Sequence, residues 1–479
     1  MGENRQILIS GGGPSGLAAA LLFHDMGWED IVVVEPRSSP EDFEKNKAFN
    51  YLVDERGQRL FRKLGFRDLL YDYGVDTSSF AATIIAPDGK AKTVEPPIVA
   101  PHRPTAFWTT RRNLLTLLHA RIKAADDGRI RLLYETRVQE IIEDRNGSAS
   151  VIAQDSAGNL QKFQPDVVLA CDGMNSAVRQ SLGSCQATPD GHFDMAKLDS
   201  ISAGLHYKVL NLPATFTAAD GDVAVADHRM SYIIPSRHKG RRKTCTLFAF
   251  PVADADQPRS VNLVRDADHI LWTINSAEAL LEYLEDAFPQ LDMRSLVTEK
   301  EAADFVSLKP GIFPAPQYAQ QLYAVLGPSS KPMHCMLIGD AAHAFPPDLG
   351  LGVNSAFEDL LILAKMLENH PALDQAFQQY EQQRKPESKA LAKLVQTVFP
   401  EQYNHRPLRT IIWAIGFQVR KGLHKVVPWL VDKPAFWLTQ DPDLSFVQIL
   451  RMKQRTDIIV RGLAIITLAM VIVLAFWLA

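Results

Sequence analysis

The sequence contains few cysteines and has little excess charge of either sign. Its 479 residues include 4 cysteines, and 51 Lys and Arg residues against 55 Asp and Glu residues give a formal net charge of -4. The cysteines show neither a CxxC pair nor zinc-ligand spacing, so we expect free thiols, no disulfide framework and no metal site. The balanced charge gives no reason to expect a nucleic-acid partner.

Apolar runs long enough to span a membrane are missing until the C-terminal end of the sequence. The first residues include acidic Glu3 and lead directly into a strand-like segment, which argues against a secretory signal peptide. From Gly462 to Ala479, by contrast, no residue is charged, and the nearby basic residues all precede this run. About 20 apolar residues span a bilayer, so we predict a tail anchor at 458–479, in the mitochondrial outer membrane or the endoplasmic reticulum, with the rest of the chain in the cytosol. The alternative is a buried C-terminal helix.

A glycine-rich turn lies between an apolar strand and an apolar helix at the start of the chain. Gly11 permits the tight turn, Gly13 allows backbone to approach a pyrophosphate, and Gly16 allows the helix to pack on the strand. The start of the helix would offer N–H groups and positive potential to phosphates. Glu35 ends the next predicted strand, where it can accept hydrogen bonds from a ribose diol. This arrangement predicts a dinucleotide site.

Two further stretches place polar residues directly after apolar strands. Asp172 follows one strand and is followed in turn by Arg179. Asp340 ends another strand, where it can accept hydrogen bonds from ribityl or ribose hydroxyls. The turn at Gly352 leads into a helix that begins near Val353. The positive N-terminal end of that helix would stabilise negative charge on the N1–C2=O edge of a reduced flavin.

These three stretches, in this order, resemble the motifs of the class A flavoprotein aromatic hydroxylases. That family has a GxGxxG turn with a downstream acid, a DG motif ending in Arg, and a GD motif. The resemblance is strongest to the kynurenine 3-monooxygenase members of this family. It covers most of the chain, although the similarity outside the three motifs is weak. It implies cofactor contacts at Gly11, Gly13, Ser15, Gly16, Glu35, Pro36, Arg37, Leu52, Arg111, Val138, Asp172, Arg179, Gly339, Asp340, Gly352, Val353 and Asn354.

The resemblance also implies an activity. NADPH or NADH would reduce FAD, the reduced flavin would capture O₂ as a C4a-hydroperoxide, and one oxygen atom would pass to an aromatic or lipophilic substrate. Two alternatives stay open. One is an FAD-dependent epoxidase or reductase of isoprenoids, and the other is a non-catalytic membrane-tethered flavoprotein.

The chain departs from that resemblance where substrate would bind. At the position where kynurenine hydroxylases are expected to hold a carboxylate with Arg, this sequence has Ala82, which cannot replace a guanidinium. Either another cation such as Arg103 serves, or the substrate is a lipophilic phenol, indole or isoprenoid. Asp348 is a candidate proton acceptor for a phenolic substrate, or else a turn residue. We expect His343 to be a hydrogen-bonded structural histidine.

The predicted fold is α/β, with a discontinuous Rossmann-like FAD-binding domain, an inserted antiparallel β substrate domain and a helical C-terminal region. An amphipathic helix that includes Leu408 to Val419 is expected to contact the membrane surface, and the alternative is a helix that caps the domain. The predicted parts are residues 1–185 (FAD-binding, with a short β excursion at 76–105), 186–330 (substrate domain), 331–400 (FAD-binding), 401–457 (basic, helical, membrane-proximal) and 458–479 (transmembrane helix).

Overall fold

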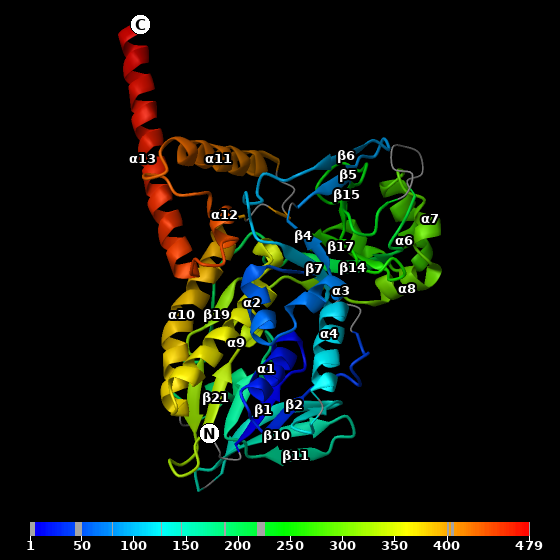
Figure 1. Cartoon of the computed structure of the whole chain (residues 1–479). Helices are drawn as coiled ribbons and strands as arrows, with labels where there is room; N and C mark the ends of the chain where they lie inside the picture. The colour runs from blue at the N-terminus through cyan, green and yellow to red at the C-terminus, as the bar shows by residue number, and fades with distance from the viewer. Residues whose placement is uncertain are drawn as a thin grey trace.

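The computed structural model contains two large sheets, each with its own apolar core, and a long final helix that leaves the body (Figure 1). It describes residues 5–43, 50–78, 80–125, 127–144, 146–185, 188–217, 226–399, 402–403 and 407–478.

The first large sheet is a six-stranded sheet in which all neighbouring strands are parallel except one edge pair. Its central strands are apolar and buried, as expected when helices cover both faces. In spatial order the strands are β20 (Tyr323–Leu326), β21 (Met333–Leu337), β12 (Val167–Ala170), β1 (Gln6–Ser10), β2 (Asp30–Val34) and β8 (Ile130–Leu133). The carboxyl ends of the parallel strands therefore share one edge.

Helices from distant parts of the chain pack around this sheet. Helix α1 (Pro14–Asp25) is buried from Gly16 to Phe23 and packs against α4 (Arg111–Ala124) and α9 (Gly352–Asn369). Proline is well tolerated at the first position of α1, because its missing N–H would have no intrahelical partner. Helix α9 also contacts α2 (Glu55–Lys63) and α10 (Leu373–Thr397), which continues through Pro386.

The second large sheet has seven strands and a separate apolar core, formed with α6 (Ala277–Ala287), α7 (Met293–Leu296) and α8 (Glu299–Ser307). All its pairs are antiparallel except β15 with β5. In spatial order the strands are β18 (Gly311–Ile312), β14 (His206–Leu212), β17 (Arg259–Arg265), β16 (Thr246–Ala249), β15 (Ser231–Pro235), β5 (Ala82–Ile85) and β6 (Ala91–Val94).

The strand pairings differ from the predicted boundaries in two places. Strands β5 and β6, assigned to the first FAD-binding segment, extend the seven-stranded sheet, with Ala82 paired to Ser231. Strand β20, assigned to the substrate segment, pairs instead with β21 in the six-stranded sheet. The alternation of residues within a strand shows which face is buried but does not identify the neighbouring strand.

Smaller elements connect these units. The short sheets contain β3 (Asn50–Val53), β7 (Ala106–Thr110) and β4 (Val75–Thr77); β11 (Leu160–Phe163), β10 (Ala149–Asp155) and β9 (Thr136–Glu143); and β13 (Met195–Lys197), β19 (Gln317–Ala319) and β22 (His343–Ala344). The remaining short helices of the body are α3 (Leu70–Tyr73) and α5 (Ala177–Ser184).

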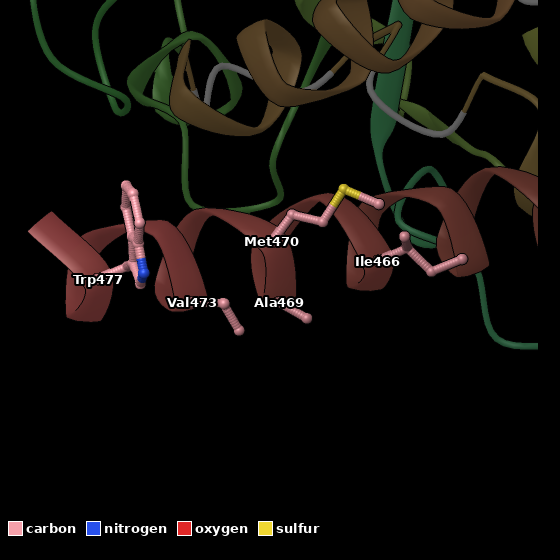
Figure 2. A pocket seen from close by; sticks show the side chains of 5 residues that line it. All are labelled: Ile466, Ala469, Met470, Val473 and Trp477. Carbon is pink, nitrogen blue, oxygen red and sulfur yellow. The ribbon is translucent and has the colours of Figure 1, made fainter.

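The C-terminal region consists of α11 (Pro407–Val426), α12 (Ala435–Thr439) and the 33-residue α13 (Phe446–Leu478). The first turns of α13 pack against α10, where Phe446 and Ile449 are buried. Further along α13, the most apolar 18-residue window has a mean hydropathy of 2.1 and is only 6% buried. Figure 2 shows five apolar side chains along this exposed half, which are Ile466, Ala469, Met470, Val473 and Trp477. The alternative of a buried C-terminal helix is therefore wrong for this half.

Candidate functional site

Four stretches that are far apart in the sequence meet at the carboxyl edge of the six-stranded sheet. Backbone hydrogen bonds hold the first three together, because Gly11 N donates to Val34 O (2.8 Å) and Cys171 N donates to Ser10 O (2.8 Å). The fourth joins through Ile338, whose N–H donates to Ala170 O (3.0 Å). The three predicted motifs thus lie side by side at the edge where α/β sheets bind nucleotides.

The glycines of the first turn have different structural roles. A Cβ at Gly16 would lie 1.8 Å from the carbonyl oxygen of Gly11, and a Cβ at Gly11 would lie 2.5 Å from that of Cys171. Gly11 also has φ of +100°, which disfavours other residues. A Cβ at Gly13 would meet nothing within 4 Å. Gly13 is the N-cap of α1, so this open space beside free helical N–H groups fits a pyrophosphate.

Glu35 and Arg37 form a buried pair beside this turn. The Glu35 carboxylate accepts hydrogen bonds from Gly12 N (2.6 Å) and from the backbone N and Nε of Arg37 (both 3.0 Å). Arg37 Nη2 donates to Gly12 O (2.7 Å), whereas its buried Nη1 has no partner among the described residues. An unpaired buried donor next to the glycine turn fits a ribose or other acceptor of a dinucleotide.

The DG stretch is held to the GD stretch by Arg179. Its Nη1 donates to Ala341 O (2.9 Å) and its Nη2 to Met174 O (2.8 Å). Asp172 Oδ2 accepts from Ala177 N (2.9 Å) at the start of α5, and burial raises the pKa of Asp172. Its Oδ1 is buried without a partner in the described part of the chain. Arg179 therefore positions the motifs, and Asp172 keeps one acceptor for a ligand.

Asp340, Arg111 and Tyr51 approach one another at the same edge. Asp340 is exposed at the turn after β21, and Arg111 begins α4. Burial raises the pKa of Tyr51 to about 12, with Asp340 adding to the effect and a hydrogen bond from Arg111 opposing it. The Asp340 carboxylate can accept hydrogen bonds and the Arg111 guanidinium can donate them, so the two groups suit the hydroxyl-bearing chain of a flavin nucleotide.

The N-terminus of α9 is fixed by Asn354, which is 1% exposed. Its Nδ2 donates to Leu52 O (2.8 Å) and Gly350 O (3.1 Å), and its Oδ1 accepts from Asp54 N (3.1 Å). Gly350 has φ of +64° and ends the turn that leads into the helix. The helix N-terminus, with its positive potential, is thereby held against β3 and α2.

Other predicted cofactor contacts are placed around this edge. Ser15 lies in α1 with its Oγ 3.0 Å from where a Cβ of Gly339 would be, so these two motifs touch. Pro36 is exposed next to Glu35, and Val138 of β9 is buried. The start of β9 is tied to the site because Thr136 N donates to Glu35 O (3.1 Å).

A buried ionic network behind the GD turn was not anticipated from the sequence. Arg384 of α10 pairs with Asp359 and donates from Nη1 to Glu358 (2.8 Å). Asp359 Oδ2 also accepts from Gly339 N (2.8 Å) and contacts His343 Nε2 (2.9 Å). Burial opposes the charge, but Arg384 and His343 hold the pKa of Asp359 below its ordinary value. His343 is hydrogen-bonded, as expected, and its structural role stays a prediction. For the rest of the network, the available sequence signal was the pair of adjacent acids in an apolar helix.

The candidate substrate residues come from three separate segments of the chain. Ala82 is buried in β5, and Arg103 donates long hydrogen bonds to the carbonyl oxygens of Thr77 (3.3 Å) and Ser78 (3.4 Å). Asp348 is 2% exposed, and neither of its carboxylate oxygens has a hydrogen-bond partner among the described residues. Burial raises the pKa of Asp348 to about 7. In the described ranges, no group of three His, Cys, Asp or Glu residues could hold a metal ion.

Comparisons with known proteins agree with this geometry. The FAD-binding domain family matches residues 4–299 and 333–395. The kynurenine 3-monooxygenase of Salinispora tropica is 23% identical over 97% of this chain and 95% of its own length, and that of Caenorhabditis elegans is 22% identical over 94% and 93%. The crystal structure of a mutant 2-methyl-3-hydroxypyridine-5-carboxylic acid oxygenase superposes with a TM-score of 0.57 at 18% identity, covering 82% of this chain and 90% of the other. At that identity the superposition shows a shared fold.

Proposed function

The chain belongs to the family of FAD-binding domains, and on that premise we propose that it is an FAD-dependent monooxygenase of the class A hydroxylase type. It uses NADPH, or NADH, to insert one oxygen atom of O₂ into an aromatic or lipophilic small molecule. In balanced form, substrate C–H, O₂, NAD(P)H and H⁺ yield substrate C–OH, NAD(P)⁺ and water. The observation that carries the proposal is the meeting of all three motifs at one sheet edge, in a chain similar to kynurenine 3-monooxygenases over nearly its whole length.

Different residues at this edge would bind different parts of FAD. The space at Gly13 and the N-terminus of α1 would hold the pyrophosphate, and Glu35 with Arg37 would hold the adenosine ribose. Asp340 would accept hydrogen bonds from hydroxyls of the ribityl chain. The positive N-terminal end of α9 would favour negative charge on a reduced flavin held beside it. Bound FAD supplies the oxygen chemistry, and the chain supplies binding and orientation.

The seven-stranded sheet forms the substrate side of the site. Contacts join it to the FAD-binding half, since Trp108 of β7 packs against Phe250 with ring centroids 5.0 Å apart and against Phe80 at 5.5 Å. Aromatic packing of this kind keeps water away from the boundary between the two halves. We therefore retain the predicted substrate domain, now including β5 and β6.

The exposed half of α13 inserts into a membrane and anchors the enzyme to it. This part of the proposal rests on the apolar, 6% buried window described above and on basic residues upstream of it. Helix α11 lies crosswise to α13 (Figure 1) and would rest on the bilayer surface. Its exposed apolar residues are Leu408, Ile411, Ile412, Ile415 and Val419.

The decisive experiment uses the full chain in detergent, loaded with FAD. NADPH oxidation and O₂ uptake are recorded with L-kynurenine and with a panel of neutral phenols and indoles, and product oxygen is traced with ¹⁸O₂. We expect one NADPH and one O₂ consumed per oxygen atom found in product. Substrate-stimulated NADPH oxidation without O₂ uptake would indicate the reductase alternative. Bound FAD without any stimulation across the panel would indicate a non-catalytic flavoprotein.

A further inference from the structure

A buried carboxylate without a partner lies one turn before α9. Asp348 is 2% exposed and belongs to the short turn Pro347–Leu349. Among the described residues, neither carboxylate oxygen accepts a hydrogen bond of normal distance and angle. An unpaired buried carboxylate is costly, and proteins generally pair such groups with protein or ligand donors. The cost suggests that the donor for Asp348 comes from a bound molecule.

The surroundings of Asp348 are aromatic and hydroxylic. Ser202 is 1% exposed, and its hydroxyl lies near enough to Asp348 for hydrogen bonding to lower the pKa of that carboxyl, against the larger effect of burial. Asp348 in turn contributes to raising the pKa of Tyr403, which burial raises most. The Tyr403 ring packs edge-on against Phe313, with centroids 5.5 Å apart. Burial is the largest cause of the raised pKa of Asp348.

This aromatic cluster continues toward the FAD edge. Phe313 packs against Tyr207 of β14 with ring centroids 5.1 Å apart. A Cβ at Gly311 would lie 2.1 Å from the Tyr207 ring, so glycine is required there for the ring to take this position. Tyr207 in turn contributes to the pKa of Tyr51, which lies beside Asp340 and Arg111. Ring contacts thus run from Tyr403 through Phe313 to Tyr207, and electrostatic interactions link the two ends of this series to Asp348 and to Tyr51.

We propose that Asp348 is a substrate-binding residue that accepts a hydrogen bond from the O–H or N–H group of a neutral aromatic substrate, held against Phe313 and Tyr403. The substrate class is a phenol or an indole, and aromatic carboxylates are excluded because their charge would face that of Asp348. The inference rests on the proposed monooxygenase function and narrows it. It also gives a reason for Ala82, since such a substrate needs no guanidinium clamp.

The test measures equilibrium binding to oxidised, FAD-loaded full chain in detergent without NADPH, so it does not depend on turnover. The probes are 4-ethylphenol, 4-ethylanisole and 4-ethylbenzoate, which share one ring and differ in having a donor, no donor or a negative charge. Binding is followed by the change in flavin visible absorption at pH 8. We expect the phenol to bind about tenfold more tightly than the anisole, as for one hydrogen bond to a charged acceptor, and the benzoate to bind most weakly.

Two variants complete the design. Asp348→Asn keeps the shape but replaces the charge, and the preference for phenol over anisole should fall to about twofold or less, as for a neutral hydrogen bond. Asp256→Asn, the same change at an exposed position, should leave the preference unchanged.

Three outcomes would each overturn the inference. They are equal binding of phenol and anisole to the wild type, tightest binding of the benzoate, and an unchanged preference in Asp348→Asn. The wild-type result decides the matter even if Asp348→Asn fails to fold. Turnover with O₂ uptake but without phenol preference would leave the monooxygenase function standing.

Discussion

Arg384 of α10 and Asp359 of α9 form an ion pair in which the two side chains are 1% and 0% exposed. The same carboxylate accepts the N–H of Gly339, so the pair fixes the helices to the GD turn at the nucleotide edge. A buried ion pair of this kind adds little stability compared with an apolar pair of similar size. Removing one member, however, leaves the other charge buried without a partner, which is strongly destabilising. Its position indicates that it sets the geometry of the turn.

Replacing Arg384 should therefore destabilise the protein strongly. In Arg384→Met the Asp359 charge stays buried without its main partner, and we expect the free energy of unfolding to fall by about 3–5 kcal/mol. Urea denaturation of the FAD-loaded protein measures it. Arg294→Met removes an exposed guanidinium paired with Glu278 and Glu285 and serves as control, with little expected change in the free energy of unfolding. Equal losses in the two variants would refute the expectation.

Gly13→Ala should separate folding from FAD binding. The added methyl meets no protein atom within 4 Å, so the variant should melt like the wild type without FAD. Its methyl would occupy the space assigned to the pyrophosphate, and FAD affinity should fall at least about tenfold, that is, about 1.4 kcal/mol. Fluorescence titration of free FAD measures the affinity. Gly422→Ala, which also meets nothing within 4 Å, is the matched control. Wild-type affinity in Gly13→Ala would place the pyrophosphate elsewhere.

The stability of the protein should depend on pH through Asp348. Its folded pKa of about 7 lies above the ordinary value of 3.8, so the folded state binds the proton more tightly and loses stability as pH rises between these values. Relative to Asp348→Asn, the wild type should lose about 2–3 kcal/mol between pH 5 and pH 8. Denaturation curves of both proteins across that range give the difference. A constant difference would mean that the Asp348 pKa is not raised.

Shortening the chain should distinguish the two halves of α13. A chain ending at Asp457 keeps Phe446 and Ile449 in their apolar cluster, so it should fold and leave the membrane fraction without detergent. A chain ending at Phe399 exposes the face of α10 that these residues cover and loses the hydrogen bonds from Arg56 to Asp441 O and Leu444 O. It should aggregate or melt at lower temperature. If the chain ending at Asp457 still sediments with membranes, the exposed half of α13 is not required for membrane attachment, and α11 or another surface of the body suffices.

The sequence is informative about this protein where the signal is local. The glycine turn at Gly11 and the acids at Glu35 and Asp340 could be placed after their strands, because buried parallel strands are apolar along their whole length. The helices that start near Arg111 and Gly352 could be placed by the same local patterns. Their contacts with a cofactor remain predictions.

The remainder depends on contacts between residues far apart in the chain. Nothing in the pattern around Ala82 shows that it pairs with Ser231, and nothing around Arg384 shows that Asp359 lies beside it. The sequence marks Asp348 as a candidate. Its burial and its lack of a partner among the described residues are visible only in the folded structure, where Ser202 and Tyr403 are its neighbours. Burial of polar groups is a property of the fold, which local patterns do not encode.

The unbroken course of α13 from the body into its apolar half determines how the enzyme would sit on a membrane. The segment from Phe446 to Ile458 rises about 18 Å along the helix axis. A flexible linker would let the body rotate freely, but a continuous helix clamped at Arg56 and α10 transmits any tilt of its apolar half to the whole molecule. The same face of the enzyme would then always be turned toward the lipid, at a nearly constant height. Substrates that accumulate at the bilayer surface would meet it in one orientation only.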